Sequence, residues 1–231
     1  VALARRYGHT PVRCKDTPGF VVNHAGRGYA PESLRVLQEG VADFATIDRI
    51  LVDAAGFRMG PFSLLDLVGL DVAHAVMKSM HAQYYGEAKY QPAYIAEPRV
   101  AAGLLGRKTG RGWYRYDKDN APEKIPEQPV PAGKAASAWA VPELKELVVK
   151  LGAQLEARPG PGTLCLVAPL GRDATATALE LGLDPAYTVA VDPLFGFAKR
   201  RTLMASPPPR TEGRDAAHAR LAARGTPVTV A

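Results

Sequence analysis

The chain has 231 residues, of which 47% are hydrophobic and 23% charged, and it carries a formal net charge of +6 at pH 7. This is an ordinary globular composition, with enough apolar residues for one large core or two small ones. No stretch approaches the roughly 18 uninterrupted apolar residues of a membrane span, and residues 1–13 contain no apolar run before a small-residue cleavage site. We therefore expect a cytoplasmic protein without a membrane partner.

The cysteines and histidines form no pattern that is typical of a metal site. Cys14 and Cys165 lie far apart in segments of different composition, which disfavours a structural disulfide and suits a reducing compartment. The five histidines form no HExxH motif, and there is no CxxC pair. We predict that the protein binds no metal.

The positive charge is densest near one aromatic-rich segment, in a basic cluster that consists of Arg107, Lys108, Arg111 and Arg115. A basic cluster among aromatic residues is compatible with single-stranded nucleic acid, through stacking and phosphate contacts. No helix-turn-helix, zinc-finger or RNA-binding signature accompanies it. We therefore expect no nucleic-acid partner and interpret the basic cluster as solvated surface or as packing around a turn.

Residues 17–103 carry apolar side chains at three- and four-residue spacing, with Gly or Pro at the breaks, which predicts helices. Pro31 must kink or restart the first helical stretch, Gly56 ends the second, and Pro61 begins the third. Further helical patterns continue up to Ala102. The first half of the chain is therefore predicted to be all-helical.

The second half alternates between strand and helix patterns. After a segment rich in Pro, Lys and Glu, an amphipathic helical pattern starts at Pro142. Apolar runs typical of strands lie near 164–167 and 188–191, and a helical pattern lies between them at 172–183. This alternation predicts a small, largely parallel α/β domain.

Both ends of the chain carry an extended pattern. Residues 8–16, GHTPVRCKD, and residues 223–231, ARGTPVTVA, resemble strands that continue into sequence beyond the two ends. An isolated edge strand at a terminus is the alternative.

Four short motifs follow one another along the first half of the chain. They are KDTPGFVVNHAGRGY at 15–29, EGVADFATID at 39–48, GFRMGPFSLLDLVGLD at 56–71 and GLLGRKTGRGWYRY at 103–116. In this order and at this spacing they resemble the C-terminal helical domain of 3-hydroxyacyl-CoA dehydrogenases. The resemblance implies an all-α dimerisation domain, similar to the C-terminal domain of 6-phosphogluconate dehydrogenase.

The resemblance also implies a role for Asn23. In this family a Rossmann domain holds NAD and a catalytic histidine paired with a glutamate, and the histidine takes the hydroxyl proton while hydride leaves for the nicotinamide. The helical domain adds the asparagine of a PGFxVN motif, which is Asn23 here. A neutral amide suits this catalytic position because it can donate to the substrate's oxygen. The alternative for Asn23 is a buried polar group that bonds a neighbouring backbone.

Other residues of the motifs are interpreted as structural. His24 stands where many relatives have arginine, and we interpret it as a surface or interface residue; His74 and His81 fit packing or surface positions. Within Met59–Phe62, the glycine and proline are expected to form a turn that caps a helix, and the outer two residues to lie in the core or near the acyl pocket. For the basic cluster, contact with a CoA phosphate is the functional alternative.

The chain lacks the pattern of a dinucleotide site. No G-x-G-x-x-G follows a strand, since Gly160 and Gly162 precede the run at 164–167, and no histidine stands in an H-F-x-N-P setting. We therefore expect a fragment, with the NAD-binding domain and the catalytic histidine outside these residues. No cofactor-binding residue is assigned within the chain.

The second half resembles the reduced Rossmann-like domain that some bacterial members, of the phenylacetate-degradation and 3-hydroxybutyryl-CoA types, carry after the helical domain. Its turn APLGRDAT holds one glycine, Gly171, and we expect that glycine to be structural. We divide the chain into the tail end of a preceding domain at 1–13, a helical domain at 14–117, a linker at 118–136 and the reduced Rossmann-like domain at 137–231.

These patterns predict the C-terminal part of an NAD-dependent 3-hydroxyacyl-CoA dehydrogenase, which oxidises (3S)-hydroxyacyl-CoA to 3-oxoacyl-CoA in the intact protein. The expected partners are an acyl-CoA substrate and a second copy of the helical domain. The sequence leaves acyl-chain preference open. The alternative is a non-catalytic dimerisation or binding module, which the presence of a strand–GxGxxG–helix unit upstream of Val1 would exclude.

Overall fold

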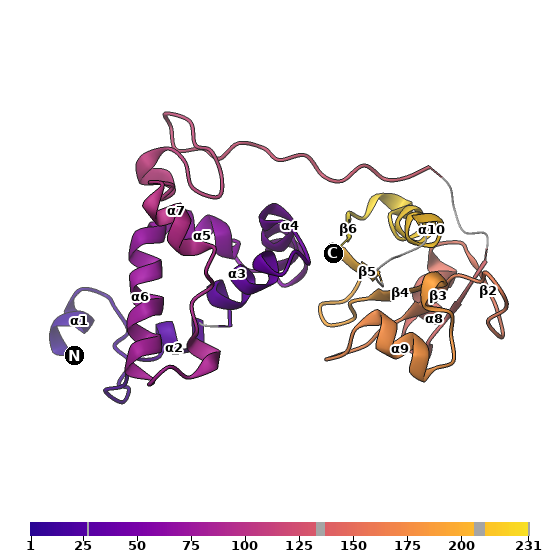
Figure 1. Ribbon diagram of the computed structural model, residues 1–231, viewed down its shortest axis with the longest axis horizontal. Coiled ribbons are helices and arrows are strands. Elements are labelled where there is room, and N and C mark those ends of the chain that lie inside the picture. Colours follow the sequence, from indigo (N-terminus) through magenta and orange to yellow (C-terminus); the bar gives the residue numbers. More distant parts are fainter. Residues whose placement is uncertain (27, 133–136, 206–210, 231) are drawn as a thin grey trace. The chain divides into compact units, whose positions relative to one another are not determined.

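The computed structural model describes residues 1–26, 28–132, 137–205 and 211–230 (Figure 1). The chain forms two compact units. Unit 1 comprises Val1–Gly40 and Pro61–Glu123, and unit 2 comprises Val41–Gly60 and Lys124–Ala231. Each unit thus combines segments that are separated in the sequence.

Unit 1 is built from helices. They are α1 (Ala2–Arg6), α2 (Val22–Gly26), α3 (Ala30–Gln38), α5 (Pro61–Val68), α6 (Leu70–Gln83) and α7 (Ala96–Ala101), with 3-10 turns η2 (Ala88–Tyr90) and η3 (Arg107–Thr109). Pro31 lies in the first turn of α3 and Pro61 begins α5, as predicted. Residues 8–16, expected to be a strand that continues beyond the chain, form no strand within the described residues.

The core of unit 1 lies between its longer helices. Helix α6 packs against α5 and α7, and α3 packs against α5. Leu34 of α3, Phe62 of α5, Leu70 of α6 and Ala96 of α7 have no exposed surface. The three- and four-residue spacing of apolar side chains therefore produces the packed helices that it predicts.

Unit 2 contains a six-stranded sheet and its covering helices. The strands are β1 (Ser137–Ala140), β2 (Gln154–Leu155), β3 (Cys165–Val167), β4 (Thr188–Val191), β5 (Arg201–Ala205) and β6 (Val228–Val230). The helices are α4 (Phe44–Arg49), the π-helix η1 (Ile50–Ala54), α8 (Pro142–Lys150), α9 (Ala174–Glu180) and α10 (Thr211–Leu221), with 3-10 turns η4 (Pro185–Tyr187) and η5 (Ala223–Gly225).

The strands lie in the order β2-β1-β3-β4-β5-β6. Strands β3 and β4 confirm the two predicted runs and pair in parallel, with Cys165 opposite Thr188. Strand β6 confirms the extended pattern at the end of the chain. Within the described sheet, only the pairing of β4 with β5 is antiparallel, and this pairing was not predicted.

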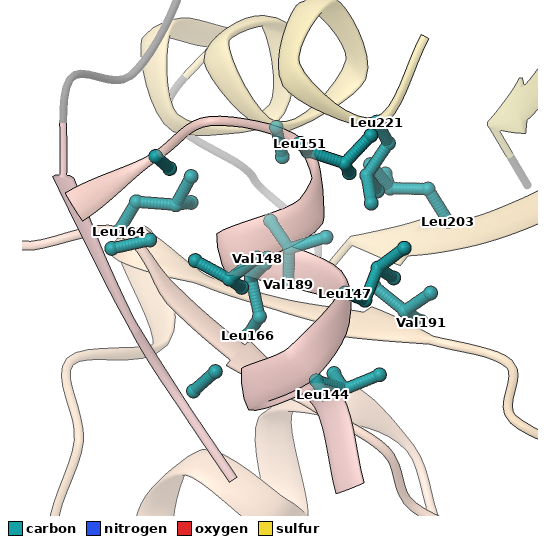
Figure 2. Packing of buried hydrophobic residues seen from close by; sticks show 14 of the residues in the cluster. Leu144, Leu147, Val148, Leu151, Leu164, Leu166, Val189, Val191, Leu203 and Leu221 are labelled. Carbon is teal, nitrogen blue, oxygen red and sulfur yellow. The ribbon is translucent and has the colours of Figure 1, made fainter. Parts of the chain in front are cut away.

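Both faces of the sheet are covered, because successive side chains of a strand point to opposite sides. Leu166, Val189 and Val191 join the cluster under α8 and α10, where Leu147 and Val148 of α8 meet them (Figure 2). The neighbouring positions, which include Cys165, Val167 and Ala190, pack on the other face with residues of α9. The result is a three-layered α/β unit.

The segment Val41–Gly60 joins unit 2 through polar contacts. Arg200, at the start of β5, donates to Asp53 of η1, to Glu127 and to the Thr229 hydroxyl. Arg49 donates to the carbonyl oxygen of Pro126, 3.1 Å away. We call Arg200 with Asp53, Glu127 and Thr229 the arginine clasp.

Candidate functional site

Helix α2, which carries Asn23, starts after a tight PGF turn. Gly19 has φ +79°, and a Cβ added there would lie 2.8 Å from Cε of Met80 and 3.0 Å from Cβ of Asn23. Phe20 follows with φ +48°, an uncommon conformation for a bulky residue. The turn therefore needs glycine at position 19, and it presses the start of α2 against α6.

The side chain of Asn23 is exposed, at the point where two hollows of unit 1 meet. We call them the inner cavity, which has a volume of about 230 Å³, and the outer groove, which lies along α6. Within the described residues the Asn23 amide makes no side-chain hydrogen bond. The alternative of a buried amide satisfied by a neighbouring backbone is thus not what the structure shows, although its catalytic role stays a prediction.

The inner cavity is lined by apolar side chains from four helices. Its floor includes Leu65, Met77 and Met80, which are at most 9% exposed. The remaining lining residues are Val22, Asn23, Gly26, Tyr29, Ala30, Pro31, Leu64, Val68, Val72, Ala73, Val76 and Tyr90. Asn23 is the one amide among them, so the site combines an apolar hollow with a neutral donor.

His24 fixes the other side of α2. Its Nδ1 lies 3.2 Å from the hydroxyls of both Tyr84 and Tyr90, whose rings stack with centroids 4.0 Å apart. Burial, followed by the neighbouring Tyr90, raises the pKa of Tyr84. The sequence analysis missed both tyrosines, because nothing in their local spacing indicates a contact with a histidine about 60 positions earlier. His24 is half-buried and bonded, so it is more than a plain surface residue.

The other motifs meet at a buried carboxylate. Asp66, 1% exposed, accepts from the backbone N–H groups of Trp113 and Tyr114, both at 2.9 Å, and from the Tyr116 hydroxyl. Burial raises the pKa of Asp66, and these hydrogen bonds oppose the rise. A Cβ on Gly112 would overlap the Asp66 carboxylate. The closing motif is therefore folded around Asp66 of the LLDLVGLD segment.

The MGPF segment is also structural. A Cβ on Gly60 would overlap the buried side chain of Asp48, which belongs to the EGVADFATID motif. Phe62 is fully buried and meets Trp113 edge-on, with ring centroids 4.9 Å apart. The expectation of a turn and a core aromatic is confirmed for Gly60, Pro61 and Phe62.

The basic cluster takes part in local contacts. Lys108 pairs with Asp71 at 2.5 Å, and the Arg107 guanidinium lies over the Tyr116 ring, 5.5 Å from its centroid. Arg111 and Arg115 are exposed. These contacts support the interpretation as surface and packing.

The two helical histidines differ in their surroundings. His74 is 5% exposed, and its Nε2 lies 2.6 Å from Glu97, which also pairs with Lys78. His81 is half-buried near the end of α6. The position of His74 makes it a packing residue that joins α6 to α7.

The turns that the structure describes in unit 2 lack the glycine-rich pattern of a dinucleotide site. The turn between β3 and α9 carries only Gly171, whose φ of +72° favours glycine for the backbone turn itself, and a Cβ built there would meet nothing within 4 Å. The turn after β1 leads at once into Pro142 at the start of α8. A pyrophosphate cradle requires several backbone N–H groups on a glycine-rich turn. The single glycine of the β3–α9 turn does not provide such a cradle.

Three further observations apply to the described residues. Cys14 and Cys165 are both free thiols. No group of three or more His, Cys, Asp or Glu side chains in this part of the chain is placed to hold a metal ion. None of the described helices is long and apolar enough to cross a bilayer.

Residues 19–116 match the family model of the 3-hydroxyacyl-CoA dehydrogenase C-terminal domain. The 3-hydroxyadipyl-CoA dehydrogenase of Escherichia coli is 44% identical over 114 residues, which are 49% of this chain and 24% of the relative. A probable 3-hydroxybutyryl-CoA dehydrogenase of Deinococcus radiodurans is 42% identical over 113 residues, 49% of this chain and 40% of the relative. The chain thus spans less than half the length of these curated relatives.

One solved structure is similar over nearly the whole chain. The crystal structure of 3-hydroxybutyryl-CoA dehydrogenase from Escherichia coli K12 has a TM-score of 0.72 and 28% identity, and the match covers 99% of this chain and 45% of that one. Residues 19–116 are therefore similar in sequence to the C-terminal domain of 3-hydroxyacyl-CoA dehydrogenases.

Proposed function

We propose that this chain is the part of an NAD-dependent 3-hydroxyacyl-CoA dehydrogenase that contacts the acyl-CoA substrate. The intact enzyme oxidises (3S)-hydroxyacyl-CoA to 3-oxoacyl-CoA. The observation that carries the proposal is the exposed amide of Asn23 at the mouth of the apolar inner cavity, on a helix held by the PGF turn and by His24. An amide in this position can donate to the substrate's C3 oxygen while the apolar part of the substrate is taken out of water.

Asn23 contributes orientation and a dipole. A donor held close to the oxygen that changes from hydroxyl to carbonyl helps to fix the reacting geometry, and it polarises the carbonyl in the reverse reaction. A neutral group does this without changing its charge when a nearby base takes a proton. NAD and that base would come from a part of the protein beyond these 231 residues, since the turns described in unit 2 do not fit a dinucleotide.

The sheet of unit 2 is proposed to be the reduced Rossmann-like domain of the bacterial enzymes, of 3-hydroxybutyryl-CoA or phenylacetate-degradation type. Its parallel strands β1, β3 and β4, covered by helices on both faces, support this assignment. Without a phosphate-binding turn, its role is structural.

We also propose that the helical domain pairs with a second copy. Leu67 of α5 is 49% exposed and Tyr94 is 69% exposed, although both are large apolar side chains in the helical unit. Sedimentation of the 231-residue chain at tens of micromolar should show a dimer. A monomer at every concentration would contradict this assignment.

The catalytic proposal is tested with the intact protein that contains this sequence. With NAD and (3S)-3-hydroxybutyryl-CoA it should produce NADH, and the 3R substrate should be inactive, because the donor must face one side of C3. The 231-residue chain alone should neither bind NADH nor oxidise it with acetoacetyl-CoA. Absence of turnover in the intact protein would leave the non-catalytic dimerisation or binding module as the better interpretation.

A further inference from the structure

We propose that Tyr84 is a positioning residue for Asn23, because its hydroxyl group contacts the chain on both sides of that asparagine. This inference rests on the proposed function, in which the Asn23 amide donates to the reacting oxygen. It adds a residue that lies about 60 positions later in the chain and acts through Asn23 without contacting the substrate.

Helix α2 depends on its surroundings for its direction. It has five residues, Val22–Gly26, and none of them is buried. A helix of this length is not stable on its own, because forming its first turn fixes several residues for one hydrogen bond. At its start, the backbone N–H of Asn23 donates to the carbonyl oxygen of Gly19, 3.0 Å away. The place of Asn23 is therefore determined by the PGF turn and by the contacts of its neighbours on α2.

The Tyr84 hydroxyl joins these two flanks. It donates to the carbonyl oxygen of Pro18, the first residue of the PGF turn, at 3.4 Å. The same hydroxyl lies 3.2 Å from Nδ1 of His24, the residue that follows Asn23. When the imidazole proton is on Nδ1, that nitrogen donates to the Tyr84 oxygen, and Tyr84 keeps its own proton for Pro18. One hydroxyl group thus connects the turn before Asn23 with the helix that carries it.

Tyr84 is itself held in place. Its ring stacks on the ring of Tyr90, with centroids 4.0 Å apart and an interplanar angle of 13°. Tyr90 is 4% exposed, and its hydroxyl lies 3.2 Å from the same nitrogen of His24. The backbone N–H of Tyr84 donates to the carbonyl oxygen of Met80 at the end of α6. The hydroxyl is therefore carried by a packed ring on a fixed backbone, which is what a positioning contact needs.

The first test follows the backbone of Asn23 in the 231-residue chain, labelled with nitrogen-15 at asparagine only. Asn23 and Asn120 are the two asparagines of the sequence, and the exposed Asn120 serves as an internal reference. Tyr84→Phe removes the hydroxyl and retains the ring that stacks on Tyr90. Exchange of the Asn23 backbone proton with water should become at least about fivefold faster, because each lost hydrogen bond shifts a local opening equilibrium by about two- to tenfold. The exchange rate of Asn120 should not change.

Tyr85→Phe is the matched control. Tyr85 is the next residue in the chain and is fully exposed, so the loss of its hydroxyl should change the exchange rate of Asn23 by less than about twofold. An exchange rate that Tyr84→Phe leaves unchanged, or that Tyr85→Phe raises equally, overturns the proposal. Faster exchange that a fall in Tm fully accounts for also overturns it, since Tyr84 would then stabilise unit 1 as a whole.

The second test is a double-mutant cycle on kcat in the intact protein. Tyr84→Phe alone should lower kcat at least about tenfold, since a misplacement of about 1 Å can cost about 100-fold, and should change KM by less than about threefold. In the Asn23→Ala background, Tyr84→Phe should change kcat by less than about twofold, because the amide that Tyr84 positions is gone. Equal losses of kcat in both backgrounds overturn the proposal, since Tyr84 would then act independently of Asn23.

The two tests separate this inference from the proposed function. If Asn23→Ala alone leaves kcat unchanged, the proposed role of the amide in the oxidation is contradicted. The exchange rates of Asn23 do not depend on turnover, so they still decide whether Tyr84 holds Asn23 in place.

Discussion

Arg200 donates through Nε to the carboxylate of Asp53, 147 residues earlier in the chain, at 2.8 Å. The Arg200 side chain is 2% exposed, whereas Asp53 and Glu127, its two acidic partners, are 41% and 50% exposed. The buried guanidinium thus connects three segments, η1, the segment after Lys124, and β6, where it reaches Thr229. This arginine clasp connects Val41–Gly60 to the other segments of unit 2.

Arg200→Lys should destabilise unit 2. The ammonium group of lysine cannot replace the guanidinium, which reaches both carboxylates and the Thr229 hydroxyl, so these groups lose hydrogen-bond partners. The free energy of unfolding should fall by about 1–3 kcal/mol. Urea unfolding measures it. Arg35→Lys is the control, because Arg35 pairs with Glu32 at the surface. This substitution should lower the free energy of unfolding by less than about 0.5 kcal/mol. Equal effects in the two variants would exclude the clasp as a stabilising contact.

The clasp should also depend on pH. Hydrogen bonds from Arg200 hold the pKa of Glu127 below its ordinary value of 4.5. Folding lowers the pKa of Glu127, so the ionised carboxylate stabilises the folded protein. This contribution to the free energy of unfolding is complete above pH 4.5 and is lost as the pH falls through the pKa of Glu127 in the folded state. Glu127 is half-exposed, so the effect is only about 1 kcal/mol. Wild type and Glu127→Gln should differ in Tm at pH 7 and converge toward pH 3, and the exposed Glu39→Gln should show no such convergence.

Gly112→Ala should destabilise unit 1 strongly, because its Cβ would overlap the carboxylate that accepts the N–H groups of Trp113 and Tyr114. Overpacking and the loss of buried hydrogen bonds together give about 2–4 kcal/mol. Gly26→Ala is the control, since a Cβ there meets nothing within 4 Å and α2 is helical. A Tm unchanged by Gly112→Ala would mean that the closing motif is not held by Asp66.

Local signals predicted much of this fold. Apolar spacing and proline positions indicated the helices α3, α5 and α6, and short apolar runs indicated β3 and β4. Contacts between distant segments were not predictable, because no local sequence pattern indicates that Asp66 accepts hydrogen bonds from the backbone of Trp113 and Tyr114. The antiparallel β5 was missed for the same reason, since its orientation is decided by pairing with β4.

The candidate site was predicted unevenly. Asn23 was identified by a motif, but its place at the mouth of a cavity depends on helices α3, α5 and α6, which only the fold brings together. Tyr84 and Tyr90, which hold His24, carry no motif at all. The residue proposed to touch substrate was therefore found from the sequence, and the residues that position it were not.

The central claim is that the amide of Asn23 donates to the reacting oxygen. In the intact enzyme, Asn23→Ala should lower kcat about 10 to 1,000-fold, as expected for the loss of one preorganised donor, while NAD affinity stays unchanged. Asn23→Asp should be at least as damaging, because a carboxylate of the same shape accepts hydrogen bonds but cannot donate one. Gln91→Ala, which removes an exposed amide elsewhere in unit 1, is the control.

The decisive measurement is therefore kcat for Asn23→Asp with (3S)-3-hydroxybutyryl-CoA, together with Tm. A loss of kcat of tenfold or more at unchanged Tm is the result that donation by Asn23 predicts. An unchanged kcat, or a fall in Tm with normal kcat, would contradict it and make Asn23 a packing residue of α2.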